Sequence, residues 1–157
     1  MPNQEYQLTL KGPAAEYLLY EGREALCVGP TRAAKSWALM IKAQYVAETY
    51  PGSRQLIARQ TRKSLYESIL KDWRDEILRM KHPAISRTAS REHQDLYRWP
   101  NGSEVFFVGL EAMQDTSSPI LSTKFDRLYI VQAEETKESA WETLATRLSS
   151  FKTPYHQ

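Results

Sequence analysis

Residues 29–36 read Gly29-Pro30-Thr31-Arg32-Ala33-Ala34-Lys35-Ser36, and this stretch decides the expected fold. It fits the pattern G-x-x-x-x-G-K-S/T, except that Ala34 takes the place of the second glycine. In that pattern backbone N–H groups surround a phosphate, the lysine reaches the outer phosphates and the hydroxyl binds Mg²⁺. Alanine resists the positive φ that glycine allows, so Ala34 weakens the match. All of residues 29–36 are therefore predicted to bind a nucleotide, and Ser36 to bind the metal.

The residues on either side of this loop support the same interpretation. Ala25-Leu26-Cys27-Val28 is a short apolar run typical of a buried strand, and residues 37–48 contain no glycine or proline. A strand, a loop and a helix N-terminus, in that order, direct backbone donors and the positive end of the helix dipole at the anion. The alternative is an ordinary strand-to-helix turn whose lysine faces water.

Composition indicates one globular domain. The chain has 157 residues and a net charge of +2, so no strong basic field indicates nucleic acid. The single cysteine, Cys27, excludes an internal disulfide and is expected to be buried in its strand. No apolar run approaches the roughly 18 residues of a membrane span, and the polar N-terminus has no signal-peptide core. A soluble, intracellular protein is therefore expected.

Strands and helices are expected to alternate along the chain. The pattern predicts helices over 13–20, 35–49, 61–80 (with Thr61 as N-cap) and 138–148, and strands over 55–58 and 128–131. Residues 95–99 and 104–108 flank Asn101-Gly102, which predicts a hairpin. The expected fold is α/β: a P-loop NTPase-like, mainly parallel sheet flanked by helices, with an antiparallel hairpin added at about 95–108.

A phosphate-binding loop needs an acidic group at the end of a second buried strand. The strand over 128–131 runs into Gln132-Ala133-Glu134-Glu135, so two carboxylates follow, although glutamine stands where an aspartate is usual. Glu134 and Glu135 are the predicted catalytic acids, with Glu134 also a metal ligand. Gln132 can position the attacking water but cannot take its proton. The alternative is that the glutamates only supply negative charge at the start of the next helix.

At this point the chain resembles the ATPase domain of the tailed-bacteriophage terminase large subunit. The matching segments cover nearly the whole chain, and their order and spacing are more specific than any one of them. They are 26–36, 55–61 with Leu65 and Ser68, 102–109 with 117–125, 126–135, 141–148, and Pro154-Tyr155 with Gln157.

The resemblance implies ATP hydrolysis coupled to translocation of double-stranded DNA into a procapsid. It implies ATP and Mg²⁺ as cofactors. The implied partners are a portal protein, a small terminase subunit and further copies in a homo-oligomeric ring, with no membrane. The implied location is the cytoplasm of an infected bacterium. Since the chain stops before the family's coupling motif and C-terminal nuclease domain, residues 1–157 are expected to be the front part of a longer protein or a truncated gene product.

Other readings remain open. The chain is alternatively another P-loop enzyme, such as a helicase-like translocase or a small-molecule kinase, or a nucleotide-binding fragment that does not hydrolyse. Further candidates for the site are arginines that stabilise phosphate charge and groups that stack on adenine. The arginines are Arg59, Arg62 and Arg147, and the stacking groups are Tyr20 and Arg23.

Overall fold

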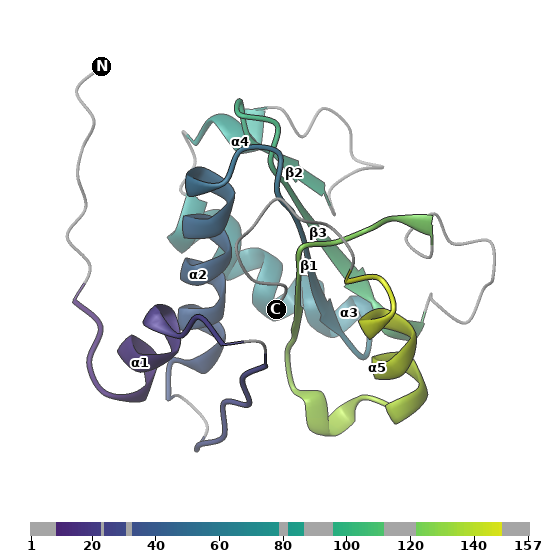
Figure 1. Cartoon of the computed structure of the whole chain (residues 1–157). Coiled ribbons are helices and arrows are strands. Elements are labelled where there is room, and N and C mark those ends of the chain that lie inside the picture. The colour runs from purple at the N-terminus through teal and green to yellow at the C-terminus, as the bar shows by residue number, and fades with distance from the viewer. Residues whose placement is uncertain are drawn as a thin grey trace.

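The computed structural model describes residues 9–22, 24–30, 33–78, 82–86, 96–111 and 122–148. Its four strands form one sheet in the order β2-β3-β1-β4 (Figure 1). The central strand β1 (Arg54–Arg59) pairs in parallel with β3 (Glu104–Gly109) on one side and β4 (Arg127–Ile130) on the other. The short strand β2 (Leu96–Arg98) is antiparallel to β3. The α/β class, the mainly parallel sheet and the added hairpin are confirmed.

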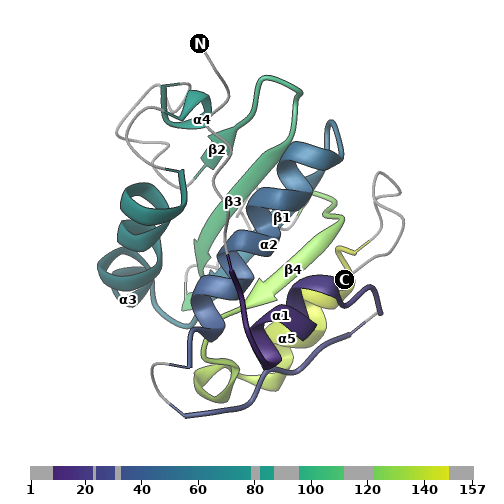
Figure 2. The ribbon, with the colours of Figure 1, turned by 90° about the vertical axis from the view of Figure 1, so that its left-hand side faces the viewer.

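Helices cover both faces of the sheet (Figures 1 and 2). They are α1 (Pro13–Leu19), α2 (Lys35–Thr49), α3 (Arg62–Ser64), α4 (Pro83–Ser86) and α5 (Glu138–Ala145). After α3 the helix continues in two wider, π-type turns over Leu65–Leu70 and Trp73–Leu78. Within the described residues no helix is both long and apolar enough to cross a membrane.

Side chains that alternate along β1 pack into two separate hydrophobic cores. Ile57 packs with the apolar side of α2 and with the long helix that follows Thr61. Leu56 and Ala58 face the other way and pack beneath α5 against Leu144. The alternation follows from the two-residue period of a strand, and burial on both faces explains why this strand is apolar throughout its middle.

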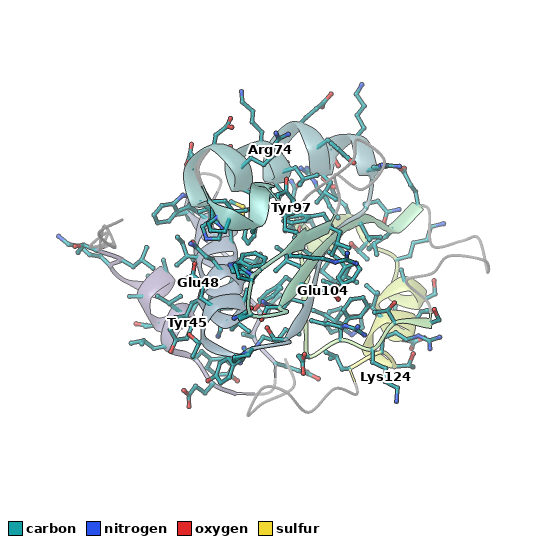
Figure 3. The ribbon with its side chains drawn as sticks, turned by 90° about the horizontal axis from the view of Figure 1, so that it is seen from above. Tyr45, Glu48, Arg74, Tyr97, Glu104 and Lys124 are labelled. Atoms are coloured by element: carbon teal, nitrogen blue, oxygen red, sulfur yellow. The ribbon has the colours of Figure 1, made fainter. Side chains whose placement is uncertain are left out.

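The predicted apolar stripe of the long helix is confirmed where the structure describes it. Leu65, Ile69, Trp73 and Ile77 are all buried, and Met80 lies outside the described residues. Trp73 meets Tyr97 edge to face, with ring centroids 6.1 Å apart. Figure 3 shows Tyr97 between the sheet and this helix, while Arg74 on the helix points away from the sheet. Thr61 caps the helix as expected, since its Oγ1 accepts a hydrogen bond from Ser64 N at 3.2 Å.

The Asn101-Gly102 turn closes the hairpin and also ties it to α2. Gly102 has a φ of 85°, which glycine adopts without strain. Trp99 N donates to Ser103 O at 2.8 Å, as a tight hairpin requires. Asn101 Nδ2 donates to Ala47 O at 2.8 Å, so a turn side chain satisfies a carbonyl in the last turns of α2.

Gly109, the last residue of β3, allows the start of α3 to lie directly against the sheet. A Cβ atom at this position would lie 2.4 Å from Arg62 N and 2.8 Å from Arg62 Cα. Arg62 N in turn donates to Glu111 Oε1 at 2.9 Å, and Glu111 N donates to Gln60 O at 3.1 Å. The absence of a side chain at Gly109 therefore fixes how the chain leaves β1.

The prediction of a buried strand over residues 25–28 is wrong. These residues form no strand with any described part of the sheet, and Leu26 and Val28 are 81% and 85% exposed. Cys27 is exposed as well, against expectation. An apolar run forms a strand only where a neighbouring strand accepts its backbone hydrogen bonds. The described strand β4 has β1 as its only strand partner, and the bridge outside it, Phe125 to Leu148, involves the chain after α5 rather than residues 25–28.

Candidate nucleotide-binding site

The helix predicted to follow the loop is present with the predicted bounds. α2 starts at Lys35, and its first turn has no side-chain cap. Ala38 N donates to Ala34 O at 2.9 Å, which is the first backbone bond of the helix. The N–H groups ahead of Ala38 are therefore free of helical partners and carry the positive end of the helix dipole. An anion placed there would accept these donors.

Ala34 adopts the backbone conformation that a glycine would normally take at this place. Its φ is 54° and its ψ 18°, in the left-handed region. A non-glycine residue there costs roughly 1–2 kcal/mol. The substitution at the second glycine position thus leaves the turn geometry intact at an energetic cost. Strained backbone of this kind persists where the surrounding structure holds it in place, and it is common at functional sites.

Lys35 closes the loop on itself. Its Nζ donates to Gly29 O at 2.6 Å and to Pro30 O at 2.8 Å. The ammonium group therefore bonds the first two residues of the loop at a solvent-exposed position. Ala33 N bonds Pro30 O at 3.3 Å, and Ser36 is partly buried in the first turn of α2. Thr31 and Arg32, also predicted to bind the nucleotide, lie outside the described residues.

The predicted acids follow the carboxyl end of β4. Gln132, directly after the buried Val131, has a φ of 54° and is the second strained non-glycine residue among those described. Residues Ala133–Glu135 form a single 3-10 turn, in which both glutamates are exposed. Exposed carboxylates can reach a bound cation or water, and carboxylate and hydroxyl oxygens are the ligands that Mg²⁺ prefers. Glu134 and Ser36 thus fit the chemistry of the metal that the sequence predicts.

The loop and the acids lie at the same edge of the sheet. α2 runs back from that edge, and the short turn after Thr49 leads into β1, so the helix is antiparallel to β1. Figure 2 shows the first turn of α2 on the side toward which the arrows of β3 and β4 point. Ligands of open α/β sheets bind at this carboxyl edge. Among the described residues no cluster of three His, Cys, Asp or Glu forms a metal site without help from a ligand.

Arg59 forms an ion pair with one of the predicted acids. It ends β1, and its Nε lies 3.9 Å from Glu135 Oε2. Its Nη1 donates to Ser64 O at 3.1 Å and Ser68 Oγ at 2.7 Å. The guanidinium is thus positioned by the start of the long helix and is oriented toward Glu135. It links the end of β1 with the turn after β4.

The other candidates differ in position, and Arg62 begins α3 shortly after the carboxyl end of β1. Arg62 stacks over its own neighbour Tyr66, 5.3 Å from the ring centroid. The backbone carbonyl of Arg147 accepts a hydrogen bond from Phe125 N at 2.9 Å, and the Nε atom of Arg147 is buried. Tyr20 donates its hydroxyl to Glu24 O at 2.8 Å and is 41% exposed. Arg23 lies outside the described residues.

Sequence reasoning missed Lys42. This lysine is 3% exposed in the middle of α2, and it follows Ala38 and precedes Val46 in a row of buried positions four residues apart. Its Nζ donates to the carbonyls of Tyr17 and Tyr20 at the end of α1. Burial, and next the charge of Arg127, lower the pKa of Lys42 to about 8. A lysine within an otherwise apolar i, i+4 row was the signal that could have revealed it.

Comparisons with known proteins give a likeness of fold. No family model matches the sequence, and no curated protein matches it. Among solved structures, the chain is similar to the large terminase of a thermophilic bacteriophage, with a TM-score of 0.62 and 16% identity. The similarity covers 88% of this chain and 32% of that protein, so the chain spans about a third of its length. At this identity the likeness concerns the fold: the chain has a terminase-like α/β fold.

Proposed function

We propose that this chain is the ATP-binding and ATP-hydrolysing module of a phage DNA-packaging motor. The observation that carries the proposal is the placement of two loops at one sheet edge. The loop with Lys35 at an uncapped helix N-terminus and the turn with Glu134 and Glu135 after β4 share that edge. The terminase-like fold supports packaging over other P-loop functions.

In this proposal the chain's own groups bind the triphosphate and orient water. The free N–H groups of the first turn of α2 donate to the phosphates, and the ammonium of Lys35 moves from Gly29 O and Pro30 O to the β and γ phosphates. The Ser36 hydroxyl and Glu134 would hold Mg²⁺, which supplies neutralisation of the charge that develops on the phosphates. Glu134 or Glu135 takes the proton of the attacking water, and Gln132 positions it.

The proposal extends to the partners that such a motor requires. Double-stranded DNA, a portal protein, a small terminase subunit and further copies in a ring would act with this module. Since the chain spans about a third of the similar terminase, these partners would engage a longer protein that includes this module. The host cytoplasm is the proposed place of action.

Nucleotide binding is tested with Lys35→Ala. Charge-assisted hydrogen bonds contribute about 1.5–3 kcal/mol each, so loss of the ammonium is expected to weaken affinity for a fluorescent ATP analogue by about 100-fold. Lys63→Ala is the matched control, because the Lys63 side chain is 84% exposed and far from α2 in the sequence. Equal affinity of the Lys35→Ala and wild-type chains would refute nucleotide binding at this loop.

Hydrolysis is tested with Glu134→Gln and Glu135→Gln, assayed for Mg²⁺-dependent phosphate release with and without linear DNA. At least one variant is expected to lose turnover and keep affinity for the analogue, because a base acts in the chemical step rather than in binding. A nucleotide-binding module without hydrolysis is the second candidate. It is favoured by the strained Gln132 at the place of the usual acid, and wild-type binding without turnover would select it.

A further inference from the structure

Two lysines of α2 donate hydrogen bonds to the chain that precedes the helix, each at a different point along that chain. Lys35 and Lys42 are seven positions apart, which is about two helical turns, so they lie on nearly the same side of α2. The Lys35 ammonium bonds the carbonyls of Gly29 and Pro30. The Lys42 ammonium bonds the carbonyls of Tyr17 and Tyr20, twelve and nine positions upstream of Gly29.

Lys42 is built into the contact between α1 and α2. Its Nζ lies 4.7 Å from the centroid of the Tyr17 ring and 5.8 Å from that of Tyr20, in addition to its hydrogen bond to Tyr17 O at 3.0 Å. Tyr17 lies in the last turns of α1 and Tyr20 is its C-cap residue; Tyr17 O also accepts a hydrogen bond from Tyr20 N at 3.2 Å, so Lys42 adds a second donor there. A cation at that end also interacts favourably with the helix dipole. Lys42 therefore satisfies the end of α1 from a neighbouring helix.

The same contact extends toward the phosphate-binding loop. Tyr20, whose carbonyl is bonded by Lys42, donates its hydroxyl to Glu24 O at 2.8 Å. From Glu24 to Gly29 the chain is exposed and has no strand partner in the described part of the protein. One end of this segment is held by Lys42 through α1 and the other by Lys35.

We propose that Lys42 is a positioning residue for the nucleotide site: by fastening the end of α1 to α2, it fixes the chain that leads into the loop at Gly29. The role rests on the proposed function, because its consequence is a loop held ready for a phosphate. If the loop is correctly placed in only a fraction of molecules, apparent affinity falls by that fraction.

The experiment compares Lys42→Met, Lys42→Arg and Lys63→Met in the full chain. Hydrogen exchange of the amides in 21–30 is measured without nucleotide, and affinity and turnover are measured with the ATP analogue and ATP. Lys42→Met keeps the bulk of the stem and removes the donors, so exchange of 21–30 is expected to rise and affinity to fall about tenfold. Saturated turnover is expected to stay within about twofold, because the described hydrogen bonds of Lys42 go to Tyr17 and Tyr20 rather than to the loop.

The controls separate positioning from general stability. Lys42→Arg keeps a cation with donors and is expected to recover at least part of the affinity, whereas the exposed Lys63→Met is expected to behave as wild type. Tyr20→Phe keeps the ring and removes the hydroxyl that donates to Glu24 O, so it is expected to raise exchange of 21–30 even if Lys42→Met does not fold.

Two results would overturn the positioning role of Lys42, and a third would overturn the part that Tyr20 has in it. Unchanged exchange of 21–30 in a folded Lys42→Met chain would do so, as would unchanged affinity despite faster exchange. Unchanged exchange in Tyr20→Phe would overturn the path through Glu24. If the wild-type chain bound no nucleotide, the proposed function would fail, while the exchange comparison would still support or overturn the fastening of this segment by Lys42.

Discussion

Replacing Gly109 by alanine is expected to destabilise the protein strongly, although the change adds a single methyl group. The new Cβ would lie 2.4 Å from Arg62 N and 2.9 Å from Arg62 Cβ, where ordinary contacts begin near 3.4 Å. The start of α3 must therefore move by about 1 Å, which corresponds to the difference from van der Waals contact. The obstructing atoms are mostly backbone, so a side-chain rotation cannot relieve the overlap.

The magnitude follows from what that shift breaks. The bond from Arg62 N to Glu111 Oε1, now 2.9 Å, would lengthen beyond hydrogen-bonding range. Loss of a hydrogen bond to a charged group costs about 1.5–3 kcal/mol, and overpacking costs about 1–3 kcal/mol. The free energy of unfolding should thus fall by about 3–5 kcal/mol. For a domain of this size the melting temperature would drop by about 6–20 °C.

Thermal unfolding followed by circular dichroism measures this effect, with Gly29→Ala as the matched control. A Cβ at Gly29 meets nothing closer than Ala33 Cβ at 3.8 Å, and Gly29 has no positive φ. The melting temperature of the Gly29→Ala chain is expected to stay within about 2 °C of the wild-type value. A Gly109→Ala chain that melts at the wild-type temperature would show that the close approach of α3 to β3 does not hold in solution.

Two further predictions concern pH and helix capping. In a Cys27→Ser background, which removes a thiol whose pKa is raised by partial desolvation, the free energy of unfolding is expected to rise by up to about 1.4 kcal/mol per pH unit between pH 8 and 10. The reason is that the folded-state pKa of Lys42 is lowered to about 8, so between pH 8 and 10 only the unfolded chain keeps the proton on this lysine. Above pH 10 the raised pKa values of Tyr17 and Tyr129 lower the free energy of unfolding as the pH rises. Urea titrations at pH 7 to 10 measure the slope, and its persistence in Lys42→Met would contradict the assignment. Thr61→Ala is expected to cost about 1 kcal/mol in the same assay because it removes the acceptor of Ser64 N, whereas Thr61→Ser should recover most of it; equal stability of all three chains would exclude a capping role.

Elements with local signals were predictable from the sequence, and elements that need distant partners were not. α2 and the hairpin around Gly102 agree with expectation because helix formers and an Asn-Gly turn act within a few residues. Residues 25–28 have equally apolar side chains, but a strand depends on a neighbour that no local pattern specifies. The order of the strands, with β1 between β3 and β4, is likewise set by packing between segments far apart.

The candidate site was predictable in outline and not in its details. The order of loop, helix, strand and acids predicted that Lys35 and Glu134 serve one site, although the strand expected over residues 25–28 is absent. The strained backbone of Ala34 was not predictable, because alanine disfavours that conformation. Nor was Lys42, whose role depends on a packing contact between α1 and α2. A charged side chain is ordinarily assigned to the surface unless its burial is known.

The central position of β1 has a consequence for how the chain folds. Its contacts to β3 and β4 join residues 50 and 72 positions apart, so loops of this length must close before the sheet exists. Such distant pairing slows folding relative to a helical bundle of equal size. During synthesis at about 5–20 residues per second, β1 would wait about 4–14 s for β4 to be made. For that interval Leu56 and Ile57 belong to an unfinished sheet, and newly made chains are then most open to aggregation or to capture by chaperones.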